Sequence, residues 1–244
     1  TRAAAAAGTP PTTAAAHGVT AGLGAQRLLD AYRALRCAYG AQRWWPAQHP
    51  FEVMVGAVLT QNTAWTNVER ALLRLGSRIE LTAEAILGLP PDELADCIRP
   101  AGYFNVKARR LRALCASVLE GGGIDRLSRL GTCELRRRLL GIHGVGPETA
   151  DDILLYAFDR PVFVVDAYTR RIFGRLGMLA GTEGYETIRA GVEAALGQDA
   201  SLYNEYHALI VRHGKDVCRT RPRCAACCLR TRCAVGGAFG SNTR

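Results

Sequence analysis

The stretch GIHGVGPETADD, residues 141–152, decides the predicted fold. It joins two amphipathic segments, CELRRRLLGI (residues 133–142) and PETADDILLYAFD (residues 147–159), and includes the end of the first and the start of the second. Two glycines separated by one residue and followed by a proline are typical of a tight turn between helices, because proline suits the first position of a helix. The stretch therefore predicts a helix, a glycine turn and a second helix.

The same turn predicts a phosphate site. Its glycines let the backbone approach another group closely, and the helix that starts at Pro147 presents free N–H groups and the positive end of its dipole. Phosphate is a natural ligand for such a helix start, and an ordinary αα-hairpin is the alternative. The residues expected to contact a phosphate backbone are Ile142, Gly144, Val145 and Gly146.

The rest of the chain indicates an all-α fold. Apolar residues recur at spacings of three and four, which predicts about ten helices and no convincing sheet. In FEVMVGAVLTQNTAWTNVERALLRLG (residues 51–76) the first half is apolar all round, so we expect a central buried helix. Polar residues 60–63 interrupt it, and the helix should kink or restart there. Asp166 is well placed as the N-cap of a later helix.

Composition favours a polyanionic partner. The net charge is +9 and the pI is near 9.3, which suits nucleic acid, although a solvated basic surface is the alternative. No uninterrupted apolar stretch approaches the roughly 18 residues of a membrane span. Residues 1–24, rich in Ala, Thr, Gly and Pro, predict a flexible and dispensable tail rather than a signal peptide, so we expect a cytoplasmic, nucleoid-associated protein.

The nine cysteines divide into two groups. Cys37, Cys97, Cys115 and Cys133 are scattered singly, as buried cytosolic thiols usually are. The others are crowded near the C-terminus, where Cys218-x5-Cys224-x2-Cys227-x5-Cys233 offers four thiolates in one loop. This spacing favours a [4Fe–4S] cluster over zinc, which usually draws two Cys-x-x-Cys pairs from separate places. Cys228 is an alternative ligand.

Four motifs resemble the endonuclease III superfamily of DNA glycosylases, in the family's order and over roughly residues 25–235. LLGIHGVGPETADDILLYAF with PVFVVDAYTRRIFGRLG resembles its helix-hairpin-helix and Gly/Pro-Asp motif. AGYFNVKARRLRALC, GAVLTQNT and CRTRPRCAACCLRTRC resemble its Gly-x-Tyr/Phe-Asn-x-Lys-Ala stretch, glutamine loop and C-terminal cluster loop. The first cysteine spacing, five residues, departs from the family's commoner six, and Cys228 stands where proline is frequent.

The resemblance implies two helical lobes with damaged double-stranded DNA bound by a monomer in the cleft between them. A six-helix barrel lobe would span residues 46–160. Residues 25–45 and 161–244 would form a cluster lobe, with the [4Fe–4S] loop at 218–233. Gln61, beside Asn62, would insert into the gap left by a flipped base; a side chain that satisfies the backbone at a helix break is the alternative. Arg219 would present charge to DNA.

The family's essential aspartate corresponds to Asp166, which on its own would be read as a helix cap. A carboxylate beside the sugar stabilises the positive charge that develops as the bond to the base breaks. The amine that forms a Schiff base in bifunctional members is replaced here by Glu148, which implies base removal without strand cleavage. Glu148 is either a first-turn acid favoured by the helix dipole or a water-positioning group.

Only two of the 31 basic residues are lysines. Lys107 matches a helix position far from the family's base pocket, so we expect it to contact phosphate. Lys215 precedes the cysteine loop and is the remaining side-chain amine that could line the pocket or pair with an acid. An amine-driven lyase would have to use one of these lysines or the N-terminus.

Three tryptophans, Trp44, Trp45 and Trp65, lie in one short window. The combination WWP…FE…GAVLTQNT resembles the 3-methyladenine glycosylase branch of the family. Electron-rich rings favour a flipped, cationic alkylpurine by stacking and cation–π attraction, although tryptophan often simply fills a core. The leading hypothesis is a monofunctional glycosylase for alkylated purines. The alternatives are an oxidised-pyrimidine enzyme with weak lyase activity and a non-catalytic, damage-sensing paralogue.

Overall fold

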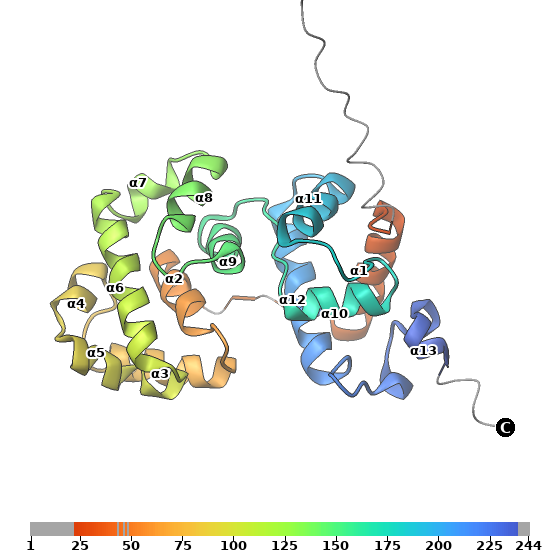
Figure 1. Cartoon of the computed structure of the whole chain (residues 1–244), viewed down its shortest axis with the longest axis horizontal. Helices are drawn as coiled ribbons and strands as arrows, with labels where there is room; N and C mark the ends of the chain where they lie inside the picture. Colours follow the sequence, from red (N-terminus) through yellow and green to blue (C-terminus); the bar gives the residue numbers. More distant parts are fainter. Residues whose placement is uncertain (1–21, 43, 46, 48, 239–244) are drawn as a thin grey trace, which may run out of the picture.

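The computed structural model describes residues 22–42, 44, 45, 47 and 49–238. These residues form α-helices joined by turns and short 3₁₀ helices, and contain no β-strand, which confirms the all-α prediction. The helices gather around two separate hydrophobic cores (Figure 1). We call the two groups of helices the first lobe and the second lobe.

The first lobe surrounds helix α2, whose residues are apolar on every side and almost all buried. Its neighbours bury one face each against this central helix. The helices of this lobe are α2 (Pro50–Leu59), α3 (Trp65–Gly76), α4 (Ala83–Gly88), α5 (Pro91–Cys97), α6 (Phe104–Glu120), α7 (Ile124–Ser128), α8 (Thr132–Leu140) and α9 (Pro147–Phe158).

The second lobe packs around aromatic side chains. Tyr206 lies between Phe163, Phe173 and Tyr32, with ring centroids 5.3 to 6.0 Å apart. Such contacts add to the burial of large apolar area. The helices of this lobe are α1 (Ala25–Tyr39), α10 (Ala167–Arg175), α11 (Tyr185–Leu196), α12 (Ala200–Asp216) and α13 (Ala234–Ala238).

Helix α9 belongs to both cores. Its Leu154 is buried in the core of the first lobe, and the next residue, Leu155, is buried in the core of the second. All side chains from Thr149 to Leu155 are buried, so the helix has no solvated face over this stretch. Figure 1 shows α9 on the side of the first lobe that faces α12. Groups on α9 therefore lie where the lobes meet.

The local sequence explains most helix boundaries. The helix predicted over residues 51–76 ends at Leu59 and restarts at Trp65, as the polar interruption indicated. Pro90 and Pro91 separate α4 from α5, since proline cannot continue a helix but suits its first turn. The apolar segment before Asp166 forms no strand and runs as an extended connection into α10.

The predicted tail needs a correction. Residues 1–21 lie outside the described part of the chain, but Leu23, which was assigned to the tail, is buried in the second core. Arg27 also donates to the carbonyl of Gly22. The folded second lobe therefore begins before residue 25. Within the described residues, none of the helices combines the length and the apolar character needed to cross a membrane.

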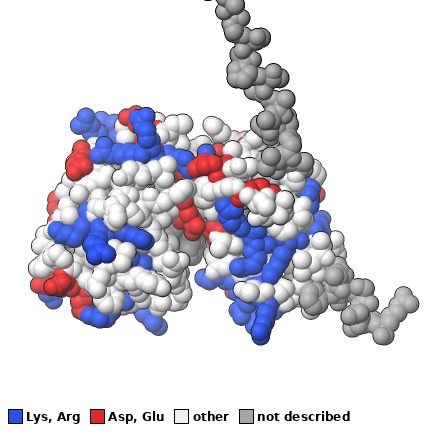
Figure 2. Space-filling model, in the orientation of Figure 1, with Lys and Arg blue, Asp and Glu red and all other residues white. Residues whose placement is uncertain are grey.

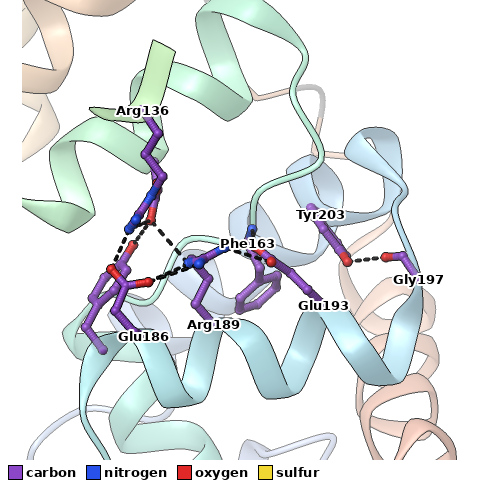
Figure 3. A network of polar contacts seen from close by, with 9 residues as sticks. Arg136, Phe163, Glu186, Arg189, Glu193, Gly197 and Tyr203 are labelled. Carbon is purple, nitrogen blue, oxygen red and sulfur yellow. Dashed lines mark hydrogen bonds and ion pairs between the residues drawn. The ribbon is translucent and has the colours of Figure 1, made fainter. Parts of the chain in front are cut away.

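A polar network ties the lobes together (Figure 3). Asp151 of α9 is fully buried and accepts two hydrogen bonds from Arg136 of α8, at 2.7 and 3.0 Å. It also accepts one from Tyr185, at 2.9 Å, on α11 of the second lobe. Arg136 continues to Glu186, which pairs with Arg189. A bidentate arginine–carboxylate pair of this kind fixes geometry as well as charge.

We predict that Asp151→Ala lowers the free energy of unfolding by about 3 kcal/mol, because it leaves the largely buried Arg136 without its main partner. Urea unfolding followed by circular dichroism measures the change. The matched control is Asp96→Ala, which removes a carboxylate that is 57% exposed and should cost under about 1 kcal/mol. Equal losses in the two variants would show that the network does not join the lobes.

Candidate functional site

Asp166 occupies the start of α10 at the junction of the lobes. Its backbone is extended, and its Oδ1 accepts a hydrogen bond of 2.6 Å from the amide of Thr169, so it caps the helix as predicted. The residue is only 8% exposed. Its second oxygen, Oδ2, takes no part in the cap and is free to act on another group.

A histidine that sequence reasoning missed faces this second oxygen. His207, buried on α12, places Nε2 3.7 Å from Oδ2 of Asp166, which is an ion-pair distance rather than a hydrogen bond. Its other ring nitrogen, Nδ1, lies 2.6 Å from the hydroxyl of Tyr156 on α9. Tyr156, His207 and Asp166 thus form a chain of contacts across the two lobes.

Two more carboxyl groups surround the pair. Glu148 and Asp152 lie one turn apart on α9 and, with Tyr156 a further turn along, share one face of that helix. Asp152 is buried, and its Oδ1 has no hydrogen-bond partner. This spacing of four is a signal in the sequence that could have identified the face; only Glu148 was singled out.

The environment separates the protonation states of these acids. Burial, together with nearby Glu148 and Asp166, raises the pKa of Asp152 to about 8 although His207 opposes the shift. Glu148 remains accessible to solvent, yet desolvation by the surrounding protein and then Asp166 raise its pKa. Burial alone would raise the pKa of Asp166 too, but His207 and the Thr169 amide outweigh it and lower that pKa. Asp166 is therefore the preferred site of negative charge.

The three tryptophans come together beside this cluster. Trp45 lies edge-to-face against Trp65, with ring centroids 4.9 Å apart, and Trp44 contacts both rings. Trp45 also lies 5.3 Å from the ring of Tyr156. Trp45 and Trp65 are half-buried against the first core, so they fill space there as well as offering ring surface. Their mutual edge contacts mean that no pre-formed parallel sandwich exists.

The glycine turn is held by three side chains of the first lobe. Gln61 donates to the carbonyl of Gly144 at 3.0 Å and to the hydroxyl of Thr149 at 2.9 Å, while Arg110 donates to Gln61. Gly144 has φ +85°, and a Cβ there would lie 2.3 Å from Cγ of Arg110. Only glycine fits this position. Gln61 braces the hairpin in this conformation, so inserting it into DNA would first require breaking these bonds.

The residues expected to contact DNA differ in their exposure. Ile142 and Val145 are 8% and 6% exposed, so their side chains anchor the turn and only its backbone is accessible. Asn62 is exposed with φ 54°, and Tyr103 is 72% exposed with φ 47°. Left-handed backbone at two non-glycine residues is strained and is held by the surrounding structure. Tyr103 was not among the residues that the sequence analysis singled out.

The two lysines do not enter the acid cluster. Lys107 is 1% exposed and its ammonium donates to the carbonyls of Leu59 and Ala101, at 2.8 and 2.9 Å, so the predicted phosphate contact is wrong. Its role is to tie the loop after α2 to the turn before α6. Lys215 is exposed near the end of α12, eight residues or about 12 Å of helix beyond His207. Neither lysine is among the residues that contact Asp166.

The cysteine loop follows α12 and packs on the second core. Cys218 is buried and its sulfur accepts from Arg175, while the Cys233 thiol donates to the carbonyl of that arginine. Burial first, and then the nearby Cys228, Cys218 and Cys233, raise the pKa of Cys227 to about 11. The donors suit a thiolate-bound group in number and kind. Among the described residues, however, no three side chains lie close enough to hold a metal in this conformation. Arg219 is exposed at the start of the loop.

We predict that Lys107→Met lowers the free energy of unfolding by about 2 kcal/mol at neutral pH, because two buried carbonyls lose their donor. Burial, and then Arg110, lower the pKa of Lys107 from 10.5 to about 8. Between these two pKa values Lys107 is protonated in the unfolded chain and deprotonated in the folded one. The free energy of unfolding of the wild type should therefore rise relative to that of the variant as pH rises. Urea unfolding from pH 7 to 10 measures this, with Lys215→Met as control. A difference in unfolding free energy between wild type and Lys107→Met that shrinks with rising pH contradicts this role of Lys107.

Known proteins match both the sequence and the fold. The HhH-GPD superfamily of base excision DNA repair proteins matches residues 55–197. A putative DNA repair glycosylase of Methanocaldococcus jannaschii is 46% identical over 83% of this chain and 93% of its own. Endonuclease III of Thermotoga maritima is 29% identical over 75% of this chain and 82% of its own.

Two solved structures are similar as a whole. H. pylori 3-methyladenine DNA glycosylase bound to 1,N6-ethenoadenine is 30% identical, with a TM-score of 0.69 over 79% of this chain and 97% of that one. An endonuclease III–DNA complex, at 22% identity, shares the fold with a TM-score of 0.76 over 88% of this chain and 98% of that one. On the family match and the 46% identical relative, this chain belongs to the HhH-GPD superfamily of base excision DNA repair proteins.

Proposed function

We propose that this protein is a monofunctional DNA glycosylase that hydrolyses the bond between deoxyribose and an alkylated purine. The observation that carries the proposal is the place of Asp166. It is a buried carboxylate held at a helix start, with one oxygen uncommitted to the cap, and His207 and Tyr156 link it to Trp45. This is the arrangement needed by a group that acts on a base and its sugar together.

Asp166 has the charge required for the chemistry. Breaking the glycosidic bond leaves positive charge on the sugar, and a fixed carboxylate nearby stabilises the transition state more than the ground state. Because His207 lowers the pKa of Asp166, the carboxylate is negative at neutral pH. Glu148, which has a raised pKa and is reached by solvent, would orient the attacking water at the same site.

The surroundings of the lysines support hydrolysis without strand cleavage. A lyase needs a free amine that attacks the sugar carbon. Lys107 is committed to two carbonyls, and Lys215 is exposed near the end of α12. The hairpin helix instead carries Glu148, which cannot form a Schiff base.

The pocket chemistry supports a cationic, alkylated purine. Indole rings attract a cation over their faces, and the Asp166 carboxylate adds negative potential near them. A base entering here would stack on an open ring face or part the edge contacts of Trp44, Trp45 and Trp65. The 3-methyladenine glycosylase of H. pylori, whose fold this chain shares, is bound to 1,N6-ethenoadenine.

The remaining surface supports binding of a DNA duplex by one copy of the chain, which we expect at the nucleoid. Helix α9 has no side-chain cap, so amides of its first turn and of Gly144 and Gly146 are placed to bind phosphate. Asn62, next to Gln61 in the chain, and Tyr103 are exposed and could contact the duplex. Basic side chains lie on both lobes and acidic ones gather between them (Figure 2).

We predict that the protein releases 1,N6-ethenoadenine or a methylated purine from an end-labelled duplex, and that the strand breaks only after hot alkali. Asp166→Asn keeps the helix cap, because an amide oxygen also accepts from Thr169, but should slow base release at least about 100-fold. Asp199→Asn is the matched control, since Asp199 caps α12 in the same way and should leave the rate unchanged.

Three outcomes contradict parts of the proposal. Base release that survives Asp166→Asn removes that residue from its role. Alkali-independent nicking of a duplex carrying an oxidised pyrimidine favours the bifunctional alternative. Binding to damaged DNA without any base release favours a non-catalytic sensor.

We also propose that Cys218, Cys224, Cys227 and Cys233 hold a [4Fe–4S] cluster of structural role, whose chemistry when bound is to cross-link the loop. The support is the loop's four thiols, three of which (Cys218, Cys227 and Cys233) pack in or against the second core. The thiols must move closer together than they lie here. Arg219, at the start of this loop, would then present its charge to DNA phosphate.

We predict about four iron atoms and four acid-labile sulfides per chain in protein purified without oxygen. Cys224→Ser should lose most of the iron, and Cys228→Ser should retain it. Zinc in place of iron, or iron lost from Cys228→Ser alone, contradicts this ligand set.

A further inference from the structure

The contacts around Asp166 form a continuous chain that the hydrolysis itself does not explain. The ring of Trp45 lies 5.3 Å from that of Tyr156, whose hydroxyl is 2.6 Å from Nδ1 of His207. Nε2 of His207 is in turn 3.7 Å from Oδ2 of Asp166. His207 is 5% exposed, and the chain links an aromatic side chain of the pocket to the carboxylate.

We propose that Tyr156 and His207 are a positioning pair that holds the Asp166 carboxylate in a fixed orientation beside the three tryptophans. The inference rests on the proposed function of Asp166 and assigns roles to two further side chains. Neither side chain is required to touch the sugar, so both act through Asp166.

The helix cap alone cannot fix the carboxylate. The Thr169 amide holds Oδ1, but a single hydrogen bond to one oxygen does not fix the plane of the carboxylate, so Oδ2 can still change its position. An imidazolium ion at 3.7 Å draws Oδ2 to one side. With both ring nitrogens protonated, Nδ1 donates to the Tyr156 hydroxyl, and this bond fixes the plane of the ring. The Tyr156 bond therefore restrains the His207 ring, and the His207 ion pair restrains the Asp166 carboxylate.

The charges facing His207 favour its protonated form. Burial alone lowers the pKa of His207, but Asp166, then Asp152 and Glu148, outweigh it and raise that pKa above the ordinary value. Tyr156 faces it from α9 and stays neutral, because burial raises the pKa of its hydroxyl. The positive charge on the α1 side, Arg36, is already paired with Glu205 and so opposes protonation of His207 little. Arg170 of α10 acts on Glu148.

An acid-rich pocket makes this arrangement useful. Three carboxyl groups lie near one another, and repulsion from Glu148 in its ionised form would turn Oδ2 of Asp166 away from it. His207 supplies the opposing positive charge on the other side. The carboxylate therefore remains directed toward the junction of the lobes.

The experiment measures single-turnover base release from the alkylated-purine duplex, and DNA affinity separately, for Tyr156→Phe, His207→Gln and the double variant. Loss of the hydroxyl should slow release about 5-fold, and loss of the imidazole about 100-fold, with unchanged affinity. The double variant should be no slower than His207→Gln, because Tyr156 acts through His207. Tyr206→Phe is the control, since its buried hydroxyl donates to Leu28 away from the site.

The pH dependence separates positioning from a merely structural effect. Without His207, burial raises the pKa of Asp166, so the acid limb of the rate profile should move to higher pH in His207→Gln. Tyr206→Phe should leave that limb in place. An unmoved acid limb, or independent losses that add in the double variant, overturns the proposal.

An activity-independent measurement guards against loss of folding or of the proposed function. The His207 ring is titrated by NMR in the wild type and in Asp166→Asn. A pKa that is raised in the wild type and falls in the variant supports the pairing; an unchanged pKa overturns it. If the wild type releases no base from any duplex, the proposed function fails, and this titration still decides whether the pair holds Asp166.

Discussion

Helix α9 packs against both hydrophobic cores, and the rest of the site depends on that constraint. Leu154 and Leu155, adjacent in sequence, are buried in different lobes, so rotating the helix would remove both side chains from the cores in which they pack. A helix fixed on all sides presents its polar residues at set angles. Glu148, Asp152 and Tyr156 lie on the side of His207 and Asp166, while the neighbouring Asp151 turns toward Arg136 and Tyr185.

This burial explains why neighbouring acids behave differently. Asp151 is compensated by an arginine and a tyrosine, and Asp166 by a helix amide and a histidine. Asp152 has no such partner for its Oδ1, and burial keeps it neutral near pH 7. One helix junction therefore holds a negative carboxylate beside a neutral acid. That combination suits a site that must stabilise positive charge without filling itself with mutually repelling ions.

The sequence pattern predicted those features that depend on neighbouring residues in the chain. The capping role of Asp166, the buried helix α2 and its interruption after Leu59 follow from side-chain type and spacing, so they were predictable. The partners of Gln61 and Lys107 were not, because each bonds a backbone carbonyl in another part of the chain. His207 lies 41 residues after Asp166, and the packing of α12 against α10 brings them together. The family resemblance located Asp166 but said nothing of what holds it.

The use of the two lysines bears on the chemistry as much as the acids do. Lys107 ties Leu59 to Ala101 and thereby supports the two strained residues, Asn62 and Tyr103, on neighbouring turns. A buried ammonium with two carbonyl partners loses them if it moves, so it is poorly suited to attack a sugar. Arginine, which supplies nearly all other positive charge, cannot form a Schiff base at neutral pH. With its side-chain amines placed in this way, the chain is suited to water as the nucleophile, which is the physical basis for proposing hydrolysis.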